Sequence, residues 1–163
     1  MIEIIRQVET RAPREIVAPF LTDFTTTAEW DPHTQACSAV GDGPVAVGRE
    51  YDNVQRIGPM RSRFRYRVRE FEPGRRIVLA SESSLLAATD AMEFADRAGG
   101  GTRVTYTARF RLKGVARLGA PVLQRLVNRI GDDGAAGMRR RLDALADQPS
   151  RSRPSSSRSS NPS

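Results

Sequence analysis

The feature that most constrains the fold is the stretch RSRFRYRVREF at residues 61–71, in which arginine occupies every second position from 61 to 69. Successive side chains of a β-strand point to opposite faces. One face of such a strand would carry Arg61, Arg63, Arg65, Arg67 and Arg69, and the other would carry Phe64, Tyr66 and Val68. A helix would scatter these arginines around its axis. The spacing therefore predicts a long strand with a solvated face and an apolar, tyrosine-bearing face.

Charges on the preceding segment predict how this strand pairs. With a turn at residues 57–60, Glu50 lies opposite Arg67 and Asp52 opposite Arg65 on the solvated face, and opposite charges directly across two strands are favourable. On the inner face the same register pairs Tyr51 with Tyr66, Asn53 with Phe64, and Gln55 with Ser62. By the same parity, a later hairpin pairs Phe94 with Val104, Met92 with Tyr106, and Asp90 with Ala108.

Residue spacing and turn residues predict the remaining elements. Strands are expected at residues 2–9, 34–41, 46–56, 60–72, 75–84, 87–96 and 102–112. Helices are expected from Ala12-Pro13 onward, over residues 23–29, and from about residue 116 or 121 to Ala146. The chain therefore reads as an antiparallel meander with a long helix laid across it.

The C-terminal part of the chain holds two irregular features. Gly131, Gly134 and Gly137 predict a kink or loose turn in the long helix, because each glycine disfavours a helix by about 1 kcal/mol relative to alanine. Residues 148–163 contain no large apolar side chain and are expected to be disordered. We therefore predict one domain over residues 1–146 and a disordered Ser/Arg/Pro tail over residues 147–163.

Length and composition narrow the class of protein. A chain of 163 residues fits a single domain with a core of its own. Its one cysteine, Cys37, fits a reducing compartment. No apolar run reaches about 18 residues, so no membrane span is predicted, and residues 1–5 lead into a strand instead of resembling a leader peptide. We expect a cytoplasmic protein.

The net charge of +7 suggests nucleic acid as a partner, but other features argue against it. The basic residues are scattered, belong to no known nucleic-acid-binding motif, and lie partly in the tail. The glycine-rich segments at residues 41–48 and 99–101 lack the strand-to-helix context and the Gly-Lys-Ser/Thr ending of a phosphate site. We therefore expect no nucleic-acid partner and no cofactor.

The order of these elements, together with several short motifs, resembles the SRPBCC (START-like, helix-grip) superfamily. Its polyketide cyclase/dehydrase and lipid-transport branch is the most similar. The resemblance covers residues 1 to about 146 and is carried by A-P-x-x-I-V at 12–17, D-F at 23–24 with W-x-P at 30–32, V-G-x-x-Y at 47–51, E-P-G-R-R-I at 72–77 and G-T-R-V-T-Y at 101–106.

This resemblance implies an α+β helix-grip fold: a curved seven-stranded antiparallel sheet, two short helices and a long C-terminal helix that together enclose a hydrophobic cavity. Members of the superfamily bind lipids, sterols, polyketides or quinones, and some catalyse cyclisation or dehydration in the cavity. They share no catalytic residue, so the resemblance assigns none to this chain.

The inner face of the predicted sheet supplies the candidate ligand-binding residues: Tyr51, Asn53, Gln55, Phe64, Tyr66, Asp90, Met92 and Tyr106. Polar groups in a filled core need partners, whereas in a ligand cavity a few of them can orient a guest. The alternative is that several of them face solvent near strand ends or satisfy one another.

Asp90 and His33 are the candidates for catalysis. A carboxylate in an apolar pocket is suited to proton transfer because burial disfavours its ionised form; alternatively, Asp90 is a strand-start residue bonded to nearby backbone or to an arginine. His33 is the one histidine of the chain and lacks the companions of a metal site or a triad. No metal site is predicted, and Cys37 fits a small core residue.

Two functions follow from this set of residues. The first is the binding of a small hydrophobic or amphipathic ligand, such as a lipid, a polyketide or a quinone-like molecule, in an internal cavity. The second is a polyketide cyclase/dehydratase that uses acid/base residues of the cavity. A cavity of about 300 Å³ or more lined by Asp90 or His33 would favour chemistry, and a collapsed or wholly apolar interior would favour carriage or a structural role.

Overall fold

The computed structural model describes residues 1–114 and 120–148. Its elements are β1 (Ile2–Thr10), α1 (Arg14–Thr22), the 3-10 turn η1 (Phe24–Thr26), α2 (Thr27–Trp30), β2 (Thr34–Val40), β3 (Glu50–Ile57), β4 (Met60–Glu72), β5 (Arg76–Glu82), β6 (Leu86–Asp96), β7 (Thr102–Leu112) and α3 (Ala120–Ala146). Apart from residues 147 and 148, the predicted disordered tail lies outside the described residues. None of the described helices is long and apolar enough to cross a membrane.

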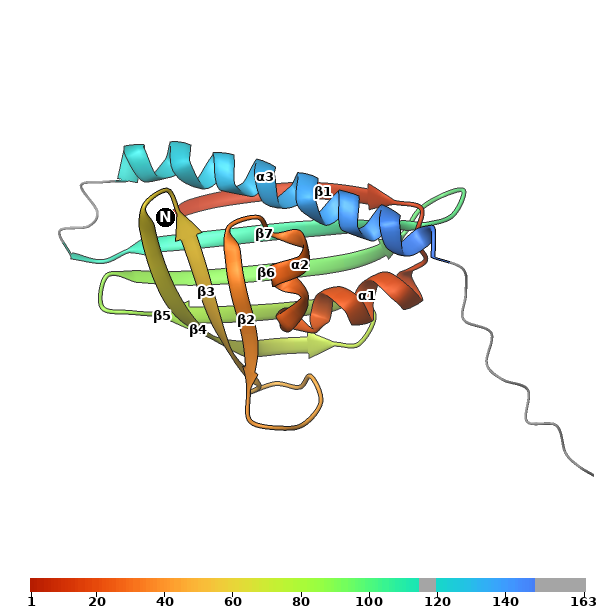
Figure 1. The fold of residues 1–163 in the computed structure, drawn as a ribbon, viewed down its shortest axis with the longest axis horizontal. Helices are drawn as coiled ribbons and strands as arrows, with labels where there is room; N and C mark the ends of the chain where they lie inside the picture. The colour runs from red at the N-terminus through yellow and green to blue at the C-terminus, as the bar shows by residue number, and fades with distance from the viewer. Residues whose placement is uncertain (115–119, 149–163) are drawn as a thin grey trace, which may run out of the picture.

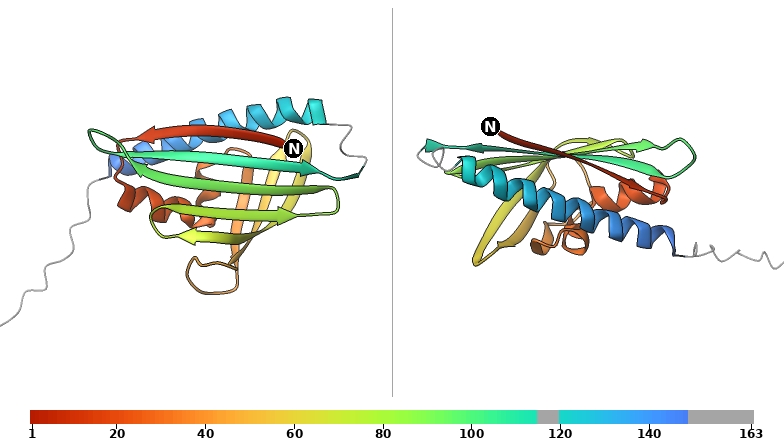
Figure 2. Two further views of the ribbon diagram at one scale, coloured as in Figure 1. Left: turned by 180° about the vertical axis from the view of Figure 1, so that it is seen from behind. Right: turned by 90° about the horizontal axis from the view of Figure 1, so that it is seen from above.

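The seven strands form one antiparallel sheet in the order β1-β7-β6-β5-β4-β3-β2. From β2 to β7 each strand pairs with the next in sequence, and β1 pairs with β7. The sheet curves around α3, which runs alongside β1, while α1 and α2 lie on the same side of the sheet (Figures 1 and 2). This confirms the predicted helix-grip architecture with two short helices and one long C-terminal helix.

The register of both predicted hairpins is confirmed. Glu50 pairs with Arg67 and Asp52 with Arg65 across β3 and β4. The inner-face pairs are also as predicted: Tyr51 with Tyr66, Asn53 with Phe64, Gln55 with Ser62, Phe94 with Val104, Met92 with Tyr106, and Asp90 with Ala108. Charge complementarity on one face therefore determined which side chains of the other face point inward.

A bulge in β4 interrupts the alternation at its far end. The register with β5 shifts between Val68 and Glu70, so Arg69 has no partner on β5. An extra residue of this kind reverses the parity of the strand beyond it. As a result Phe71 lies opposite the buried Ile77 and packs against the core, and two consecutive residues, Arg69 and Glu70, are exposed.

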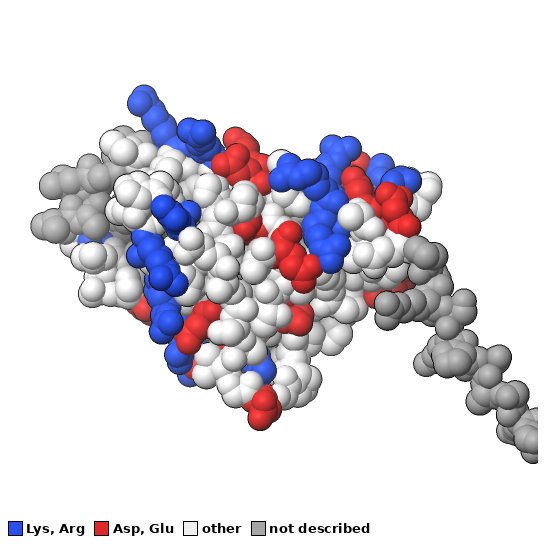
Figure 3. All heavy atoms as spheres, in the orientation of Figure 1, with Lys and Arg blue, Asp and Glu red and all other residues white. Residues whose placement is uncertain are grey.

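The arginine-rich face of the sheet forms ion pairs with acidic residues on neighbouring strands. Arg65 Nε lies 2.6 Å from Asp52, and Arg67 lies 2.7 Å from Glu50. These pairs hold the pKa values of Glu50 and Asp52 below their usual range, chiefly through the arginine hydrogen bonds. Basic and acidic groups are also interspersed on the helix-bearing side of the molecule (Figure 3).

The segment between α1 and β2 differs slightly from the predicted helix over residues 23–29. It consists of η1 followed by the single turn of α2. The Asp23 carboxylate caps η1 by accepting a hydrogen bond from the Thr25 N–H at 3.1 Å.

The strand β3 begins at Glu50, later than the predicted residue 46. Gly48, with a φ of 91°, turns the chain just before β3, so the strand starts only after this glycine.

The core consists of two clusters of buried side chains. The larger lies between the sheet, α1 and the C-terminal half of α3, and includes Leu21, Met138 and Leu142. The smaller lies between β1, β7 and the N-terminal half of α3, and includes Ile4 and Val127. The pocket described below takes wall residues from both clusters.

The predicted interruption of the long helix is wrong. Helix α3 is continuous through Gly131, Gly134 and Gly137, and all three are buried. A Cβ at Gly131 would lie 2.4 Å from Ile4 Cδ1 on β1, and one at Gly137 would lie 2.0 Å from the Trp30 carbonyl oxygen. The glycines therefore allow α3 to approach β1 and α2 closely.

Candidate ligand pocket

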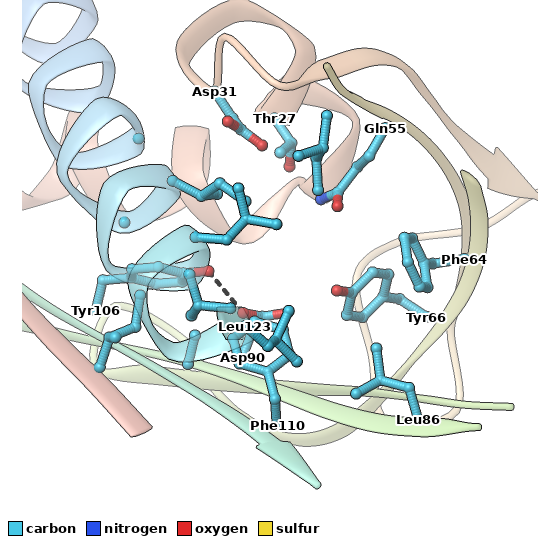
Figure 4. A pocket seen from close by; sticks show the side chains of 18 of the residues that line it. Thr27, Asp31, Gln55, Phe64, Tyr66, Leu86, Asp90, Tyr106, Phe110 and Leu123 are labelled. Carbon is cyan, nitrogen blue, oxygen red and sulfur yellow. Dashed lines mark hydrogen bonds between the residues drawn. The ribbon is translucent and has the colours of Figure 1, made fainter. Parts of the chain in front are cut away.

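A partly enclosed pocket with a cavity volume of about 130 Å³ lies between the inner face of the sheet and the N-terminal half of α3. Helix α3 contributes Leu123, Leu126, Val127 and Ile130, whose spacing places them on one side of a helix. The strands contribute Phe64, Leu86, Ala108 and Phe110, which follow the inward parity of their strands. Most of the wall is therefore apolar (Figure 4).

A carboxylate and two phenols form the polar centre of this pocket. Asp90 on β6 is buried, with 5% of its surface exposed. Its Oδ1 accepts a hydrogen bond of 2.6 Å from the hydroxyl of Tyr106 on β7, and the hydroxyl of Tyr66 on β4 points toward the same space (Figure 4). Burial raises the pKa of Asp90 above its ordinary value, although the two tyrosine hydroxyls act in the opposite direction.

The two phenols are themselves shifted by this environment. Burial, and then the neighbouring Asp90 charge, raise the pKa values of Tyr66 and Tyr106 well above the ordinary value of a phenol. Both hydroxyls therefore stay protonated across the physiological range. They can donate hydrogen bonds to Asp90 or to a guest, and the hydrogen-bonded pair of Asp90 and Tyr106 is the part of this pocket best suited to acid/base chemistry.

Asp31 provides a second buried carboxylate on the pocket wall. Pro32 follows it and favours an extended conformation at Asp31, which ends α2 there. Its Oδ1 accepts a hydrogen bond from the His33 N–H at 3.0 Å, and its Oδ2 accepts one from the Thr34 hydroxyl at 2.7 Å. These bonds orient the Asp31 carboxylate on the pocket wall.

The structure places the predicted site residues in two groups. The first group lines the pocket and consists of Gln55, Phe64, Tyr66, Asp90 and Tyr106. The second group points inward as predicted but is buried in the core and does not line the pocket; it consists of Tyr51, Asn53 and Met92. Tyr51 packs edge-on against Phe24, with ring centroids 5.7 Å apart.

His33 also lies away from the pocket wall. Its Nε2 is 3.1 Å from the Asp133 carboxylate on α3, so it links β2 to the helix on the partly exposed side of the molecule. Among the described residues, no three side chains of His, Cys, Asp or Glu lie together as a metal site requires. In this arrangement the side chain of His33 contacts α3 through Asp133.

The sequence interpretation missed several wall residues that come from helices and loops. Trp30, Asp31 and Thr27 belong to the η1–α2 segment, where no simple periodicity marks the inward direction. Leu86 and Phe110 share the inward parity of Asp90 and Tyr106, and continuing the strand pattern past the pair Asp90–Ala108 reaches Phe110 after one step and Leu86 after two. Trp30 also holds its indole Nε1 buried without a hydrogen-bond partner among the described residues.

Cys37 on β2 is partly buried and provides a test of its own environment. Burial raises the pKa of its thiol from the usual 9.0 to about 11. Because the thiolate is the reactive form, we expect folded Cys37 to react with iodoacetamide at pH 8 roughly a hundredfold more slowly than in the unfolded chain. Mass spectrometry of timed samples with and without denaturant measures both rates, and equal rates would contradict the buried placement.

The fold and the pocket together define a START-like helix-grip protein. Residues 1–146 match the family described as polyketide cyclase / dehydrase and lipid transport. The chain belongs to this family. No curated protein matches it.

Solved structures with this fold come from several bacteria. A START superfamily protein from Mycobacterium smegmatis is 14% identical with a TM-score of 0.73, covering 88% of this chain and 98% of that one. A protein from Thermus thermophilus is 17% identical with a TM-score of 0.75, covering 90% and 99%. The Zhui aromatase/cyclase from a Streptomyces species is 14% identical with a TM-score of 0.74, covering 88% and 94%. At these identities the likeness concerns the fold alone.

Proposed function

We propose that this protein binds a small hydrophobic or amphipathic ligand in the pocket between the sheet and α3. The observation that carries the proposal is a largely apolar wall on which Asp90, Tyr106 and Tyr66 converge (Figure 4). Such a combination is typical of small-molecule sites, where apolar area supplies affinity and a few polar groups supply orientation. The family match supports the same class of function. The cytoplasmic location and the absence of a nucleic-acid partner stay predictions.

The size of the cavity limits the ligand. At about 130 Å³ it is smaller than the cavity of about 300 Å³ that would favour chemistry on a bulky substrate. A space of this order holds a guest about as large as one benzene ring. A lipid or polyketide chain would therefore require α3 or the strand ends around the pocket to move outward on binding.

The single tryptophan offers a direct assay. Trp30 lines the pocket and is the one tryptophan of the chain, so its fluorescence reports on pocket occupancy. Titration with single-ring and longer hydrophobic probes should change this emission in a saturable way. Native mass spectrometry of protein purified from its own host would identify a co-purifying ligand. Probes that leave the emission unchanged at every concentration would contradict the proposal.

Filling the pocket should weaken the binding of probes. Ala108 on β7 is buried on the pocket wall, and it is the cross-strand partner of Asp90 on the neighbouring strand β6. We expect Ala108→Leu to weaken probe binding by at least about tenfold, because the larger side chain occupies the space of the guest. Thr107→Leu is the matched control, since Thr107 lies on the same strand but faces the opposite side of the sheet, next to Ile5 and Ala91. Equal effects of the two variants would place the ligand elsewhere.

The Asp90–Tyr106 pair favours a second function, the cyclase/dehydratase. A carboxyl group with a raised pKa, hydrogen-bonded to a phenol at 2.6 Å, can shuttle a proton to and from a confined polyketide-like substrate. His33 has no place in this scheme because it does not line the pocket. An Asp90→Asn variant that retained full turnover of an identified substrate would exclude Asp90 as the proton carrier.

A further inference from the structure

The charged side chains that line the pocket are all of one sign. Among the described wall residues, Asp31 and Asp90 are the charged ones, and the wall holds no lysine, arginine or histidine. Both carboxylates are buried, with 8% and 5% of their surfaces exposed. An isolated buried charge is costly unless a partner of opposite charge or a proton compensates it.

Neither carboxylate finds that compensation among the described residues. The hydrogen-bond donors to Asp31 are a hydroxyl and a backbone N–H, and the donor to Asp90 is a phenol. By contrast, the carboxylate of Asp52 on the outer face of the sheet lies 2.6 Å from Arg65. The charge of Asp31 also raises the pKa of Asp90, in addition to burial, so the two groups share one electrostatic environment.

Aromatic rings form much of the same wall. They are Phe24, Trp30, Phe64, Tyr66, Tyr106 and Phe110. The ring centroids of Phe24 and Tyr66 lie 5.1 Å apart, and those of Trp30 and Tyr106 lie 6.4 Å apart. The faces of aromatic rings attract cations, most strongly where water is excluded.

We propose that the ligand of this pocket carries a positively charged nitrogen, as a protonated amine or a quaternary ammonium group on a compact hydrophobic body. This inference rests on the proposed function, because it names the chemical class of the ligand that the pocket takes. The cationic nitrogen lies between Asp31 and Asp90, which approach the pocket from different sides, and the aromatic rings surround the rest of the molecule (Figure 4).

The competing arrangement is a neutral ligand. In that case Asp90 is protonated and donates a hydrogen bond to a carbonyl group of the guest, as a buried carboxylic acid can. The two arrangements differ in the charge of the ligand and in how its affinity depends on pH.

The titratable groups that face Asp90 come from three elements: Tyr106 from β7, Tyr66 from β4 and Asp31 from the end of α2. The wall residues of α3 are apolar or glycine.

Calorimetric titration of the full-length protein with three single-ring probes separates these cases. Benzylamine is cationic, benzyl alcohol is a neutral molecule of the same shape, and benzaldehyde carries a carbonyl group. We expect benzylamine to bind at least about tenfold more tightly than the other two at pH 7, as a charge-assisted contact in a buried site allows. Its affinity should fall as the pH is lowered through the raised pKa of Asp90, while that of benzyl alcohol stays constant.

Variants then assign the preference to the carboxylates. Asp90→Asn retains an oxygen that can accept the Tyr106 hydrogen bond, and it should remove most of the preference for benzylamine, measured as the ratio of the benzylamine affinity to the benzyl alcohol affinity. Asp31→Asn should reduce the same preference. If either variant fails to fold, the comparison of the three probes on the unaltered protein still decides the question.

Equal or tighter binding of benzyl alcohol or benzaldehyde would overturn the cationic ligand and leave the proposed function intact. Failure of all three probes to bind, together with no response of Trp30 fluorescence to longer hydrophobic probes, would overturn the proposed function itself. The two failures are therefore distinguishable.

Discussion

A Gly137→Ala variant is expected to unfold at a clearly lower denaturant concentration than the unaltered protein. The new Cβ would lie 2.0 Å from the carbonyl oxygen of Trp30 and 3.2 Å from its carbonyl carbon. Both are backbone atoms and cannot rotate away, so α3 must move from α2. Overpacking of this kind costs about 1–3 kcal/mol, which exceeds the gain of about 1 kcal/mol from replacing glycine by alanine in a helix.

Gly134→Ala is the matched control one turn earlier. Its Cβ would meet Trp30 at 4.0 Å, an ordinary contact, so the helix-propensity gain is retained and the free energy of unfolding should rise by up to about 1 kcal/mol. Gly131→Ala should fall between the two, because its close neighbour is the mobile end of the Ile4 side chain. Chemical denaturation of the three variants measures the order. Stabilisation by Gly137→Ala would contradict the close approach of α3 to α2.

Asp90→Asn is expected to stabilise the protein at neutral pH and to lose this advantage in acid. Burial raises the pKa of Asp90 in the folded state above its value in the unfolded chain, so the folded protein binds the proton more tightly. The stability that Asp90 contributes is therefore complete at a pH below its pKa in the unfolded chain. It declines as the pH rises through its pKa in the folded protein. Asparagine resembles the protonated acid and does not titrate, so the decline disappears in the variant.

The difference in free energy of unfolding between the two proteins, measured from acid to neutral pH, tests this expectation. Asp52→Asn is the control with the opposite sign. Its pKa is lowered, chiefly by the hydrogen bond from Arg65, so its contribution to stability is present above the unfolded pKa and is lost as the pH falls through the folded-state value. An Asp90→Asn protein that is less stable than the parent at neutral pH would show that the ionised carboxylate is well compensated, and would contradict the uncompensated charge.

The sheet could be predicted in detail because its determinants are local. Alternating side chains identify a strand, and the pairs Glu50–Arg67 and Asp52–Arg65 identify the register of a hairpin whose two strands are joined by a short turn. The bulge at Arg69 escaped prediction although the alternation breaks there, where the consecutive charged residues Arg69 and Glu70 precede an apolar Phe71 with the parity of the arginines. Its position depends on how β4 pairs with β5.

The pocket was predicted in part. The alternation of side chains along the strands correctly predicted that the eight candidate residues face the inside of the sheet. It does not distinguish a residue that faces the pocket from one that packs into the core. Tyr51 packs against Phe24 and thus belongs to the core, whereas its partner Tyr66 also reaches the pocket. Asp31 escaped notice because its direction depends on the chain turning at Pro32 after the short helix α2.

The alternating arginines were sufficient to define the sheet, its register and the inward set of side chains, because strand period and cross-strand charge act between residues close in sequence. The tertiary structure decided where α3 lies over that inward face. Helical propensity counts Gly131, Gly134 and Gly137 as defects, but a Cβ at Gly131 would meet Ile4 and one at Gly137 would meet the Trp30 backbone, so glycine allows the close approach at these two positions. This packing of α3 against β1 and α2 joins segments far apart in the sequence, and no local pattern encodes it.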